Sequence, residues 1–262
     1  MPLRDWVQRP RALDFLGVQS DLADLVVAFT PAQYRLRLDV SSGARVTRGA
    51  AEVHVGGDLL PPGAPQSASG AEVGRIERVV RVVADGPPTV EHQLLEIPAG
   101  FRDRGSGTEL VWRSIELYRS AGIEAVTLEA ANYGRYVWAM CGFEFDPSSL
   151  WGRDAVVGAA ERFVKRLNIR DLDEPADFSH IRQPSEIALM GGWVPLDELI
   201  EANERGLKFW ISSADDGRER VDAGKAILMA GDVPPWRGRL DIRDGSYGLD
   251  LLRDYTEGRP WR

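Results

Sequence analysis

Alternation of apolar and polar residues in the first third of the chain predicts a set of β-strands. Residues 34–40 read YRLRLDV and alternate over seven positions, as a strand with one buried face does. Residues 51–60 follow as a second strand, in which a Gly-Gly pair indicates a bulge or the close approach of another backbone. Residues 73–83 and 89–97 flank a turn-rich Asp-Gly-Pro-Pro connection, which suits antiparallel pairing. We therefore expect four strands here.

A helical period appears on both sides of these strands. Residues 10–29 space apolar residues at helical intervals and predict one or two amphipathic helical turns. Residues 105–121 carry one apolar face and end at Gly122, a residue type common at helix C-termini. The next expected elements are a strand, a short helix and a strand, at residues 125–129, 133–141 and 142–145. The resulting order is helix, four strands, helix, strand, helix, strand, which predicts an α/β fold.

The pattern changes after residue 146, where segments around 155–167 and 196–204 have a helical period. An apolar run inside residues 224–231 predicts a last buried strand that returns to the sheet, and the segment after Pro234 is too irregular to assign. The predicted organisation is therefore a core, a helical insertion on the acceptor side, and a final strand with its tail in the same domain, at residues 1–146, 147–221 and 222–262.

Composition and charge exclude several classes of function. The formal net charge of −8 and the pI near 5.1 argue against binding to nucleic acid, which depends on a basic surface. Cys141 is the only cysteine, which excludes an intrachain disulfide and a thiolate metal cluster. The three histidines lie far apart in sequence without the spacing of metal ligands, so we expect no metal.

Charged residues such as Arg4, Asp5 and Arg9 interrupt the apolar residues of the N-terminal segment, residues 1–27, so we expect no signal peptide. No segment approaches the ~18 to 20 apolar residues that span a bilayer. We therefore expect a cytoplasmic protein that does not contact a membrane.

A glycine-bearing turn at residues 102–107 leaves a predicted strand and opens a predicted helix. Its backbone N–H groups converge at the positive end of the helix dipole, a geometry that binds phosphate. Two glycines allow an anion to approach the backbone, and Arg102 and Arg104 can add charge-assisted contacts. The alternative is a tight turn without a ligand. The chain has neither the phosphate loop of nucleoside triphosphatases nor a complete dinucleotide-binding glycine pattern at this turn.

Two motifs in residues 91–145 resemble those of the GNAT acyltransferases. Arg102, Gly105 and Gly107 match the pattern Gln/Arg-x-x-Gly-x-Gly/Ala, whose backbone amides hold the coenzyme A pyrophosphate in that family. The stretch from Asn132 to Phe143 is similar to the next motif, a short helix that ends in Gly-Phe before a strand. The resemblance implies a GNAT fold, which has a mixed central sheet flanked by helices, here with a helical insertion before the last strand.

The resemblance also implies an acyl-CoA cosubstrate, expected to be acetyl-CoA, whose pantetheine arm enters between two splayed parallel strands. A backbone N–H near residues 95–97 would hold the thioester carbonyl. The residues expected to bind the coenzyme are Leu95, Ile97, Arg102, Arg104, Gly105, Ser106, Gly107, Thr108, Asn132 and Trp138.

The acid and base of the expected transfer have several candidates. Glu91 precedes Arg102 by eleven residues, which resembles the position of the base in the histone-modifying branch of the family. Strand alternation places His92 and Glu96 on the face opposite to Glu91, and a bulge in this strand would keep both as alternatives. Where the family usually keeps a tyrosine as general acid this chain has Trp138, whose indole can only donate a hydrogen bond.

The acid role could fall to Tyr136 or Tyr133, which could also be packing residues. Cys141 is expected to be a small buried residue, without a role as nucleophile.

The expected activity is direct transfer of an acyl group from CoA to an amine on a small molecule or a peptide, by a chain that could form a homodimer. One alternative is a non-catalytic module that binds acyl-CoA or has a regulatory role. Another is an acyltransferase that acts on a macromolecule in a toxin-like role, which predicts a basic face with three arginines, Arg162, Arg166 and Arg170.

Overall fold

The structure is a computed structural model of the chain. It describes residues 35–38, 43–47, 50–61, 63–65, 72–83, 87–96, 106–120, 122–149, 152–167, 169, 172, 178–204, 206, 209 and 219–258. The chain divides into two compact units. Unit 1 comprises Met1–Thr127, Asp241–Leu249 and Thr256–Arg262, and unit 2 comprises Leu128–Leu240 and Asp250–Tyr255.

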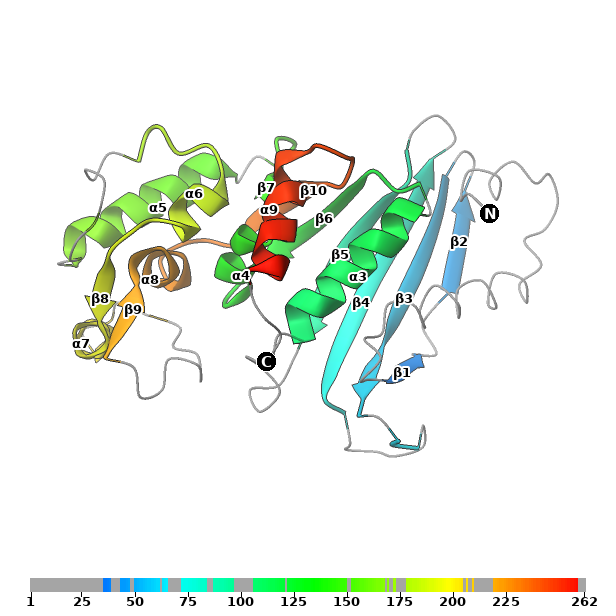
Figure 1. Cartoon of the computed structure of the whole chain (residues 1–262), viewed down its shortest axis with the longest axis horizontal. Helices are drawn as coiled ribbons and strands as arrows, with labels where there is room; N and C mark the ends of the chain where they lie inside the picture. Colours follow the sequence, from blue (N-terminus) through cyan, green and yellow to red (C-terminus); the bar gives the residue numbers. More distant parts are fainter. Residues whose placement is uncertain are drawn as a thin grey trace. The chain divides into compact units, whose positions relative to one another are not determined.

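Unit 1 contains an antiparallel meander that the sequence predicted well. Its strands are β1 (Arg35–Leu38), β2 (Gly43–Thr47), β3 (Ala50–Leu60), β4 (Gly74–Val83) and β5 (Thr89–Glu96). Their order is β1-β3-β4-β5, with β2 also paired to β3, and β6 (Ala125–Ala130) follows β5 in the sheet (Figure 1). All four predicted strands are confirmed. The short strand β2 was not predicted, because its one β-branched apolar residue, Val46, gives no clear alternation.

Helix α3 (Ser106–Ser120) covers one face of β3, β4 and β5 (Figure 1). The cluster that joins them contains Leu59, Val73, Ile76 and Leu110, with Leu95 packed against it. The helix ends before Gly122, as predicted, and this glycine has φ +79°, a conformation that favours glycine. The N–H groups of Gly122 and Ile123 bond the carbonyls of Arg119 and Tyr118, which is the Schellman pattern.

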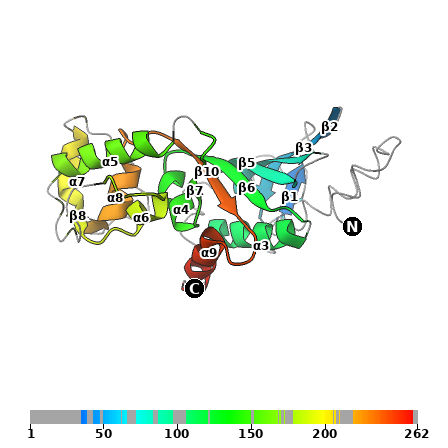
Figure 2. The ribbon, with the colours of Figure 1, turned by 90° about the horizontal axis from the view of Figure 1, so that it is seen from above.

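Unit 2 contains the strand order β6-β10-β7, in which β6 contributes residues 128–130. The predicted short helix and strand are α4 (Gly134–Met140) and β7 (Glu144–Phe145). Strand β10 (Trp236–Asp241) pairs antiparallel with β7 and lies beside β6 (Figure 2). The α/β fold with a mixed central sheet flanked by helices is confirmed.

A helical layer precedes β10, as predicted, and the views agree that its helices lie together (Figure 2). It comprises α5 (Arg153–Arg166), α6 (Pro184–Ala188), α7 (Leu196–Glu204), α8 (Ala223–Met229) and the two-stranded sheet β8 (Trp193–Pro195) with β9 (Arg220–Asp222). Both helices predicted in this region are therefore confirmed. The domain boundaries at residues 146 and 221 remain a prediction, and the helix predicted at residues 10–29 lies outside the described residues.

The prediction of a last strand at residues 224–231 is wrong, because all but the last two of these residues belong to helix α8. All seven residues of α8 are buried, so its apolar side chains show no period that separates a buried helix from a buried strand. The returning strand is instead β10, in the segment left unassigned, where Trp236, Gly238 and Leu240 are buried and the arginines between them are exposed. Helix α9 (Tyr247–Glu257) was also missed.

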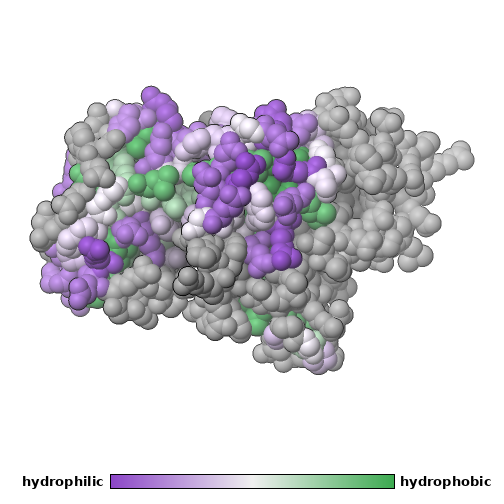
Figure 3. Space-filling model, viewed as in Figure 1, coloured by the Kyte–Doolittle hydropathy of each residue, from purple (hydrophilic) through white to green (hydrophobic). Residues whose placement is uncertain are grey.

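Hydrophobic residues form only small groups between hydrophilic ones on the described surface seen in Figure 3. Among the described residues, the exposed large hydrophobic side chains are Leu189, Ile200 and Tyr247. The described helices include none that is both long enough and apolar enough to cross a bilayer.

Candidate functional site

Strand β5 contains a β-bulge at Gln93, in the strand that carries Glu91, His92 and Glu96. Glu77 of β4 pairs with Leu94, and the next residue, Arg78, pairs with His92, so Gln93 is one extra residue on β5. Gln93 is exposed. A bulge bends its strand and changes which side chains share a face.

The bulge brings Glu91 and Glu96 to the same face of the sheet. In the register, Glu91 lies opposite Val79 and Glu96 lies opposite Arg75, and the odd-numbered residues of β4 share one face. His92 and Leu95 lie on the other face, beneath α3, where His92 is buried. The two carboxylate candidates therefore lie on one surface, and His92 is not part of it.

Glu91 is tied into a chain of ion pairs on this surface. Its Oε2 accepts a hydrogen bond of 2.6 Å from Nη1 of Arg81, and the Nε of Arg81 donates to Oε1 of Glu52 at 2.8 Å. These contacts raise the pKa of Arg81, with the hydrogen bond to Glu52 as the largest cause. The side chain of Glu91 is 21% exposed, so it is still accessible to solvent. Glu96, at the end of the strand, is exposed.

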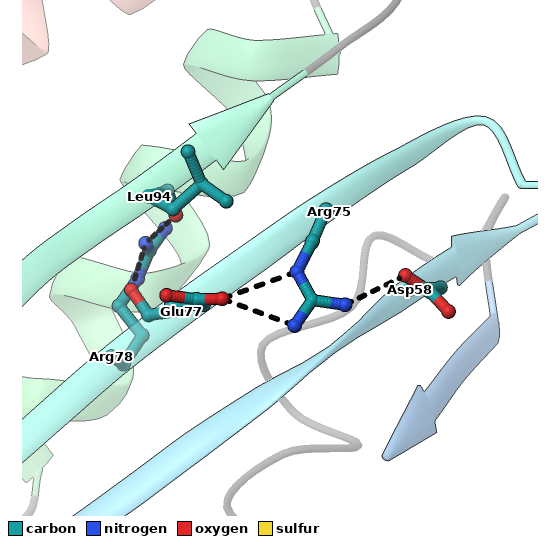
Figure 4. Close-up of polar contacts among 5 residues, drawn as sticks. All are labelled: Asp58, Arg75, Glu77, Arg78 and Leu94. Carbon is teal, nitrogen blue, oxygen red and sulfur yellow. Dashed lines mark hydrogen bonds and ion pairs between the residues drawn. The ribbon is translucent and has the colours of Figure 1, made fainter. Parts of the chain in front are cut away.

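A second ion-pair chain lies on the same surface, nearer the end of β5 (Figure 4). Arg75 donates from Nε and Nη2 to Oε1 of Glu77 at 3.1 and 3.0 Å, and from Nη1 to Oδ1 of Asp58 at 3.1 Å. Because both carboxylates accept from one guanidinium, this face presents a network with alternating charge.

A buried cation lies on the other face of the bulge. Arg78 is only 2% exposed, and its Nη1 donates to the carbonyl oxygens of Leu94 at 2.7 Å and Glu77 at 3.0 Å (Figure 4). Its guanidinium also donates to the hydroxyl of Tyr118 on α3. Burial lowers the pKa of Arg78, and the Tyr118 hydroxyl partly offsets this effect.

Tyr118 links Arg78 to His92, since its hydroxyl lies 2.9 Å from Nε2 of His92. Burial raises the pKa of Tyr118 to about 12. Burial, followed by the charge of Arg78, lowers the pKa of His92 well below its ordinary value of 6.5. At neutral pH the phenol keeps its proton and the imidazole is neutral, so this group is suited to hold structure and not to transfer protons.

The predicted phosphate turn is described only from the start of α3. Ser106 is the first residue of α3, so the helix begins where the motif requires, and Thr108 is buried with 6% exposure. Gly107 is half-buried. The remaining coenzyme candidates of this segment lie outside the described residues, and they are Ile97, Arg102, Arg104 and Gly105.

The candidates of unit 2 lie on or next to α4. Asn132 precedes the helix in a left-handed conformation with φ 50° and is exposed, whereas Tyr136 is half-buried. Trp138 is 8% exposed and packs edge-on against Phe143, with ring centroids 5.4 Å apart. This packing accounts for the burial of Trp138 without a ligand.

Tyr133, the other tyrosine of this motif, lies under the ammonium group of Lys225, whose Nζ is 5.5 Å from the ring centroid. Cys141 is fully buried, as expected. Within the described part of the chain, no cluster of three or more His, Cys, Asp or Glu residues could hold a metal ion.

The arginines of the alternative macromolecular site are only partly described. Arg162 and Arg166 are exposed on α5, and Arg166 pairs with Asp232 at 2.8 Å. Arg170 lies outside the described residues.

The sequence reasoning missed Arg78, although a signal was present. Ile76, Arg78 and Val80 occupy alternate positions of β4, so an arginine falls between two apolar residues on the buried stripe. A charged residue on a buried stripe indicates a specific partner, because an unpaired buried charge is costly.

No model of a protein family matches this chain, and no curated protein matches it. Among solved structures, it is similar to the NatC complex bound to Gag peptide and CoA, with 13% identity and a TM-score of 0.29, over 37% of this chain and 65% of that one. It is also similar to a tandem GNAT protein from the clavulanic acid biosynthesis pathway, with 18% identity and a TM-score of 0.22, over 62% of this chain and 44% of that one. The chain thus spans less than two thirds of each structure, and both TM-scores are too low to bear on its activity.

Proposed function

We propose that the chain is an acyl-CoA-dependent N-acyltransferase that moves an acyl group, in the first instance acetyl, directly to an amine. The observation that carries the proposal is the bulge at Gln93 in β5, followed by a helix that begins at the glycine motif. A bulge directs backbone N–H groups out of the sheet, where they can bind a thioester carbonyl. The start of the helix offers further N–H groups to the pyrophosphate.

The proposal assigns the chemistry to backbone groups and carboxylates. An amine attacks the thioester carbon, the carbonyl oxygen gains negative charge that an N–H near residues 95–97 stabilises, and the CoA thiolate leaves. The attacking nitrogen loses one proton, which a carboxylate accepts directly or through water, and the departing thiolate takes up a proton from solvent or from a tyrosine.

Two carboxylates on one face of the sheet can serve as the base in this proposal. Glu96 is exposed and next to Leu95, whereas Glu91 is four residues away and has Oε2 bonded to Arg81. Glu91 would act through a water molecule, since extended residues rise about 3.3 Å each. Both remain candidates for the base.

The test is release of CoA thiol from acetyl-CoA in the presence of a panel of primary amines, polyamines, aminoglycosides and basic peptides. The proposal predicts amine-dependent release that falls by about 10²-fold or more in the variant that removes the base, Glu91→Gln or Glu96→Gln. Thr89→Val, a change on the same face of β5, is the matched control. Absence of release with every amine, in a preparation that binds acetyl-CoA, would overturn the catalytic role.

A non-catalytic acyl-CoA-binding module is the second candidate function. Its support is Trp138, which occupies the position of the family tyrosine and is packed against Phe143. Indole has no acidic proton to give to a thiolate at neutral pH. This candidate predicts acetyl-CoA binding without turnover, and the same assay distinguishes the two functions.

A further inference from the structure

The peptide group between Leu94 and Leu95 is fixed from one side by a buried side chain. Arg78 Nη1 donates across the strand pair to the Leu94 carbonyl oxygen at 2.7 Å, and the same nitrogen donates to the carbonyl of Glu77, its neighbour on β4, at 3.0 Å. Thus one nitrogen joins β4 to β5 at the position where the bulge interrupts their register. Charge-assisted bonds of this kind are about twice as strong as neutral ones.

The orientation of the Leu95 N–H follows from this bond. A trans peptide group is planar, and its C=O and N–H point in opposite directions. Since the Leu94 carbonyl points to the guanidinium, the N–H of Leu95 points away from it. The positive charge at the carbonyl end also polarises the peptide group, which makes its N–H a stronger donor.

The guanidinium is itself held in place from the helix side. It donates to the hydroxyl of Tyr118 on α3, which lies 2.9 Å from Nε2 of His92 on β5. Leu95 adds a packing contact to the cluster of Leu59, Val73, Ile76 and Leu110 on the same face. These bonds to two carbonyls and a hydroxyl hold the guanidinium in one position.

We propose that Arg78 is a positioning residue for acyl transfer, which fixes the Leu94–Leu95 peptide group so that the Leu95 N–H meets the thioester carbonyl. This inference rests on the proposed function. Arg78 does not touch the acyl group in this account, and it acts only through the backbone of β5.

The test is isotope-edited infrared spectroscopy of acetyl-CoA labelled with ¹³C at the thioester carbonyl, bound to the full chain. In wild type the carbonyl band moves to lower wavenumber on binding, because a donor polarises the C=O bond. In Arg78→Met the band returns toward its position in free acetyl-CoA, while the dissociation constant stays within about threefold. Arg78→Lys, which keeps a charged donor of similar reach, recovers part of the shift.

Arg75→Met is the matched control. Arg75 is an arginine on the same strand, but it pairs with the side chains of Asp58 and Glu77 on the opposite face. The band in this variant stays at the wild-type position. A full shift in a folded Arg78→Met variant, or a wild-type complex without a shift, overturns the positioning role and leaves the proposed function standing. Failure of wild type to bind acetyl-CoA refutes the proposed function itself.

A measurement on wild type keeps the inference testable if Arg78→Met does not fold. With ¹⁵N-leucine labelling, the amide resonance of Leu95 moves downfield on addition of acetyl-CoA, and it moves more than with CoA alone. The Leu94 amide, on the other side of the fixed carbonyl, moves less. An unchanged Leu95 resonance in the acetyl-CoA complex contradicts the inference.

Discussion

The Nη1 atom of Arg78 lies 2.7 Å from the carbonyl oxygen of Leu94, on the buried side of the bulge in β5. This contact joins a charged side chain with 2% exposure to the backbone of the residue that follows the bulge. It connects the core under α3 with the surface that carries Glu91 and Glu96, so its removal should change stability and, under the proposed function, activity.

Removal of Arg78 should reduce stability more than removal of an arginine on the opposite face. In Arg78→Met two partly buried carbonyls lose a charged donor, which costs about 1–3 kcal/mol of unfolding free energy. Arg75→Met breaks partly exposed ion pairs and costs about 1 kcal/mol or less. Urea denaturation of both variants measures the difference. Equal losses of unfolding free energy in the two variants would show that Arg78 contributes no more to stability than Arg75.

Stability should fall toward acid because of His92. Its pKa in the folded chain is well below 6.5, first through burial and then through the charge of Arg78. Below about pH 6.5 the unfolded state binds a proton that the folded state does not. The unfolding free energy therefore falls as the pH is lowered, by at most ~1.4 kcal/mol per pH unit. In His92→Gln this contribution is absent. Urea denaturation of wild type and His92→Gln between about pH 8 and about pH 5 measures how the unfolding free energy of each depends on pH. Identical dependence in the two proteins would contradict the burial of a neutral His92.

Tyr118 should give a loss of stability at the alkaline end. Its pKa in the folded chain is raised from 10.0 to about 12 by burial. Above pH 10 the unfolded chain ionises and the folded chain does not, so the unfolding free energy falls as pH rises from 10 to about 12. Tyr118→Phe should be less sensitive across this window. Absorbance titration of the tyrosines gives an independent measurement. In wild type one tyrosine ionises at a higher pH than the others, and this step is missing in Tyr118→Phe.

A pair of glycine substitutions tests the helical identity of α8. A Cβ on Gly224 would lie 2.3 Å from the carbonyl oxygens of both Ile187 and Ala188, so Gly224→Ala should cost about 1–3 kcal/mol or more. On α5, a Cβ on Gly158 would meet only the Nη1 of Arg162 at 3.4 Å, so Gly158→Ala should stabilise by about 0.5–1 kcal/mol. Thermal unfolding of the two variants measures both effects. An unchanged stability in Gly224→Ala would contradict the contact between α6 and α8.

The elements with a clear period were predictable from sequence, and the elements buried on all sides were not. Strands β3, β4 and β5 alternate, and α3 has one apolar face closed by Gly122, so local patterns were sufficient. In α8 the apolar run is as compatible with a strand as with a helix, and only packing against α6 decides between them. In β10 the alternation of Trp236, Gly238 and Leu240 was present, but a glycine between arginines obscured it.

The parts of the candidate site that depend on a backbone motif were predictable from sequence. The parts that depend on how the strands pair were not. The start of α3 followed from the glycine motif, whereas the position of the bulge depends on the register between β4 and β5, which no glycine or proline marks. As a result, the grouping of Glu91 with Glu96 and the exclusion of His92 required the structure. Arg78 shows the same limit, because its partners come from two strands and a helix.

The most direct test of acyl-CoA binding at the start of α3 is a calorimetric titration of the full chain with acetyl-CoA, compared with Gly107→Trp. Gly107 lies in the first turn of α3, where an indole would occupy the space that the proposed function assigns to the pyrophosphate. Gly158→Ala is the control for general effects. We predict saturable binding with one site in wild type and in the control, and a loss of at least about tenfold, or roughly 1.4 kcal/mol, in Gly107→Trp. No binding by wild type, or equal binding by Gly107→Trp, would contradict the assignment.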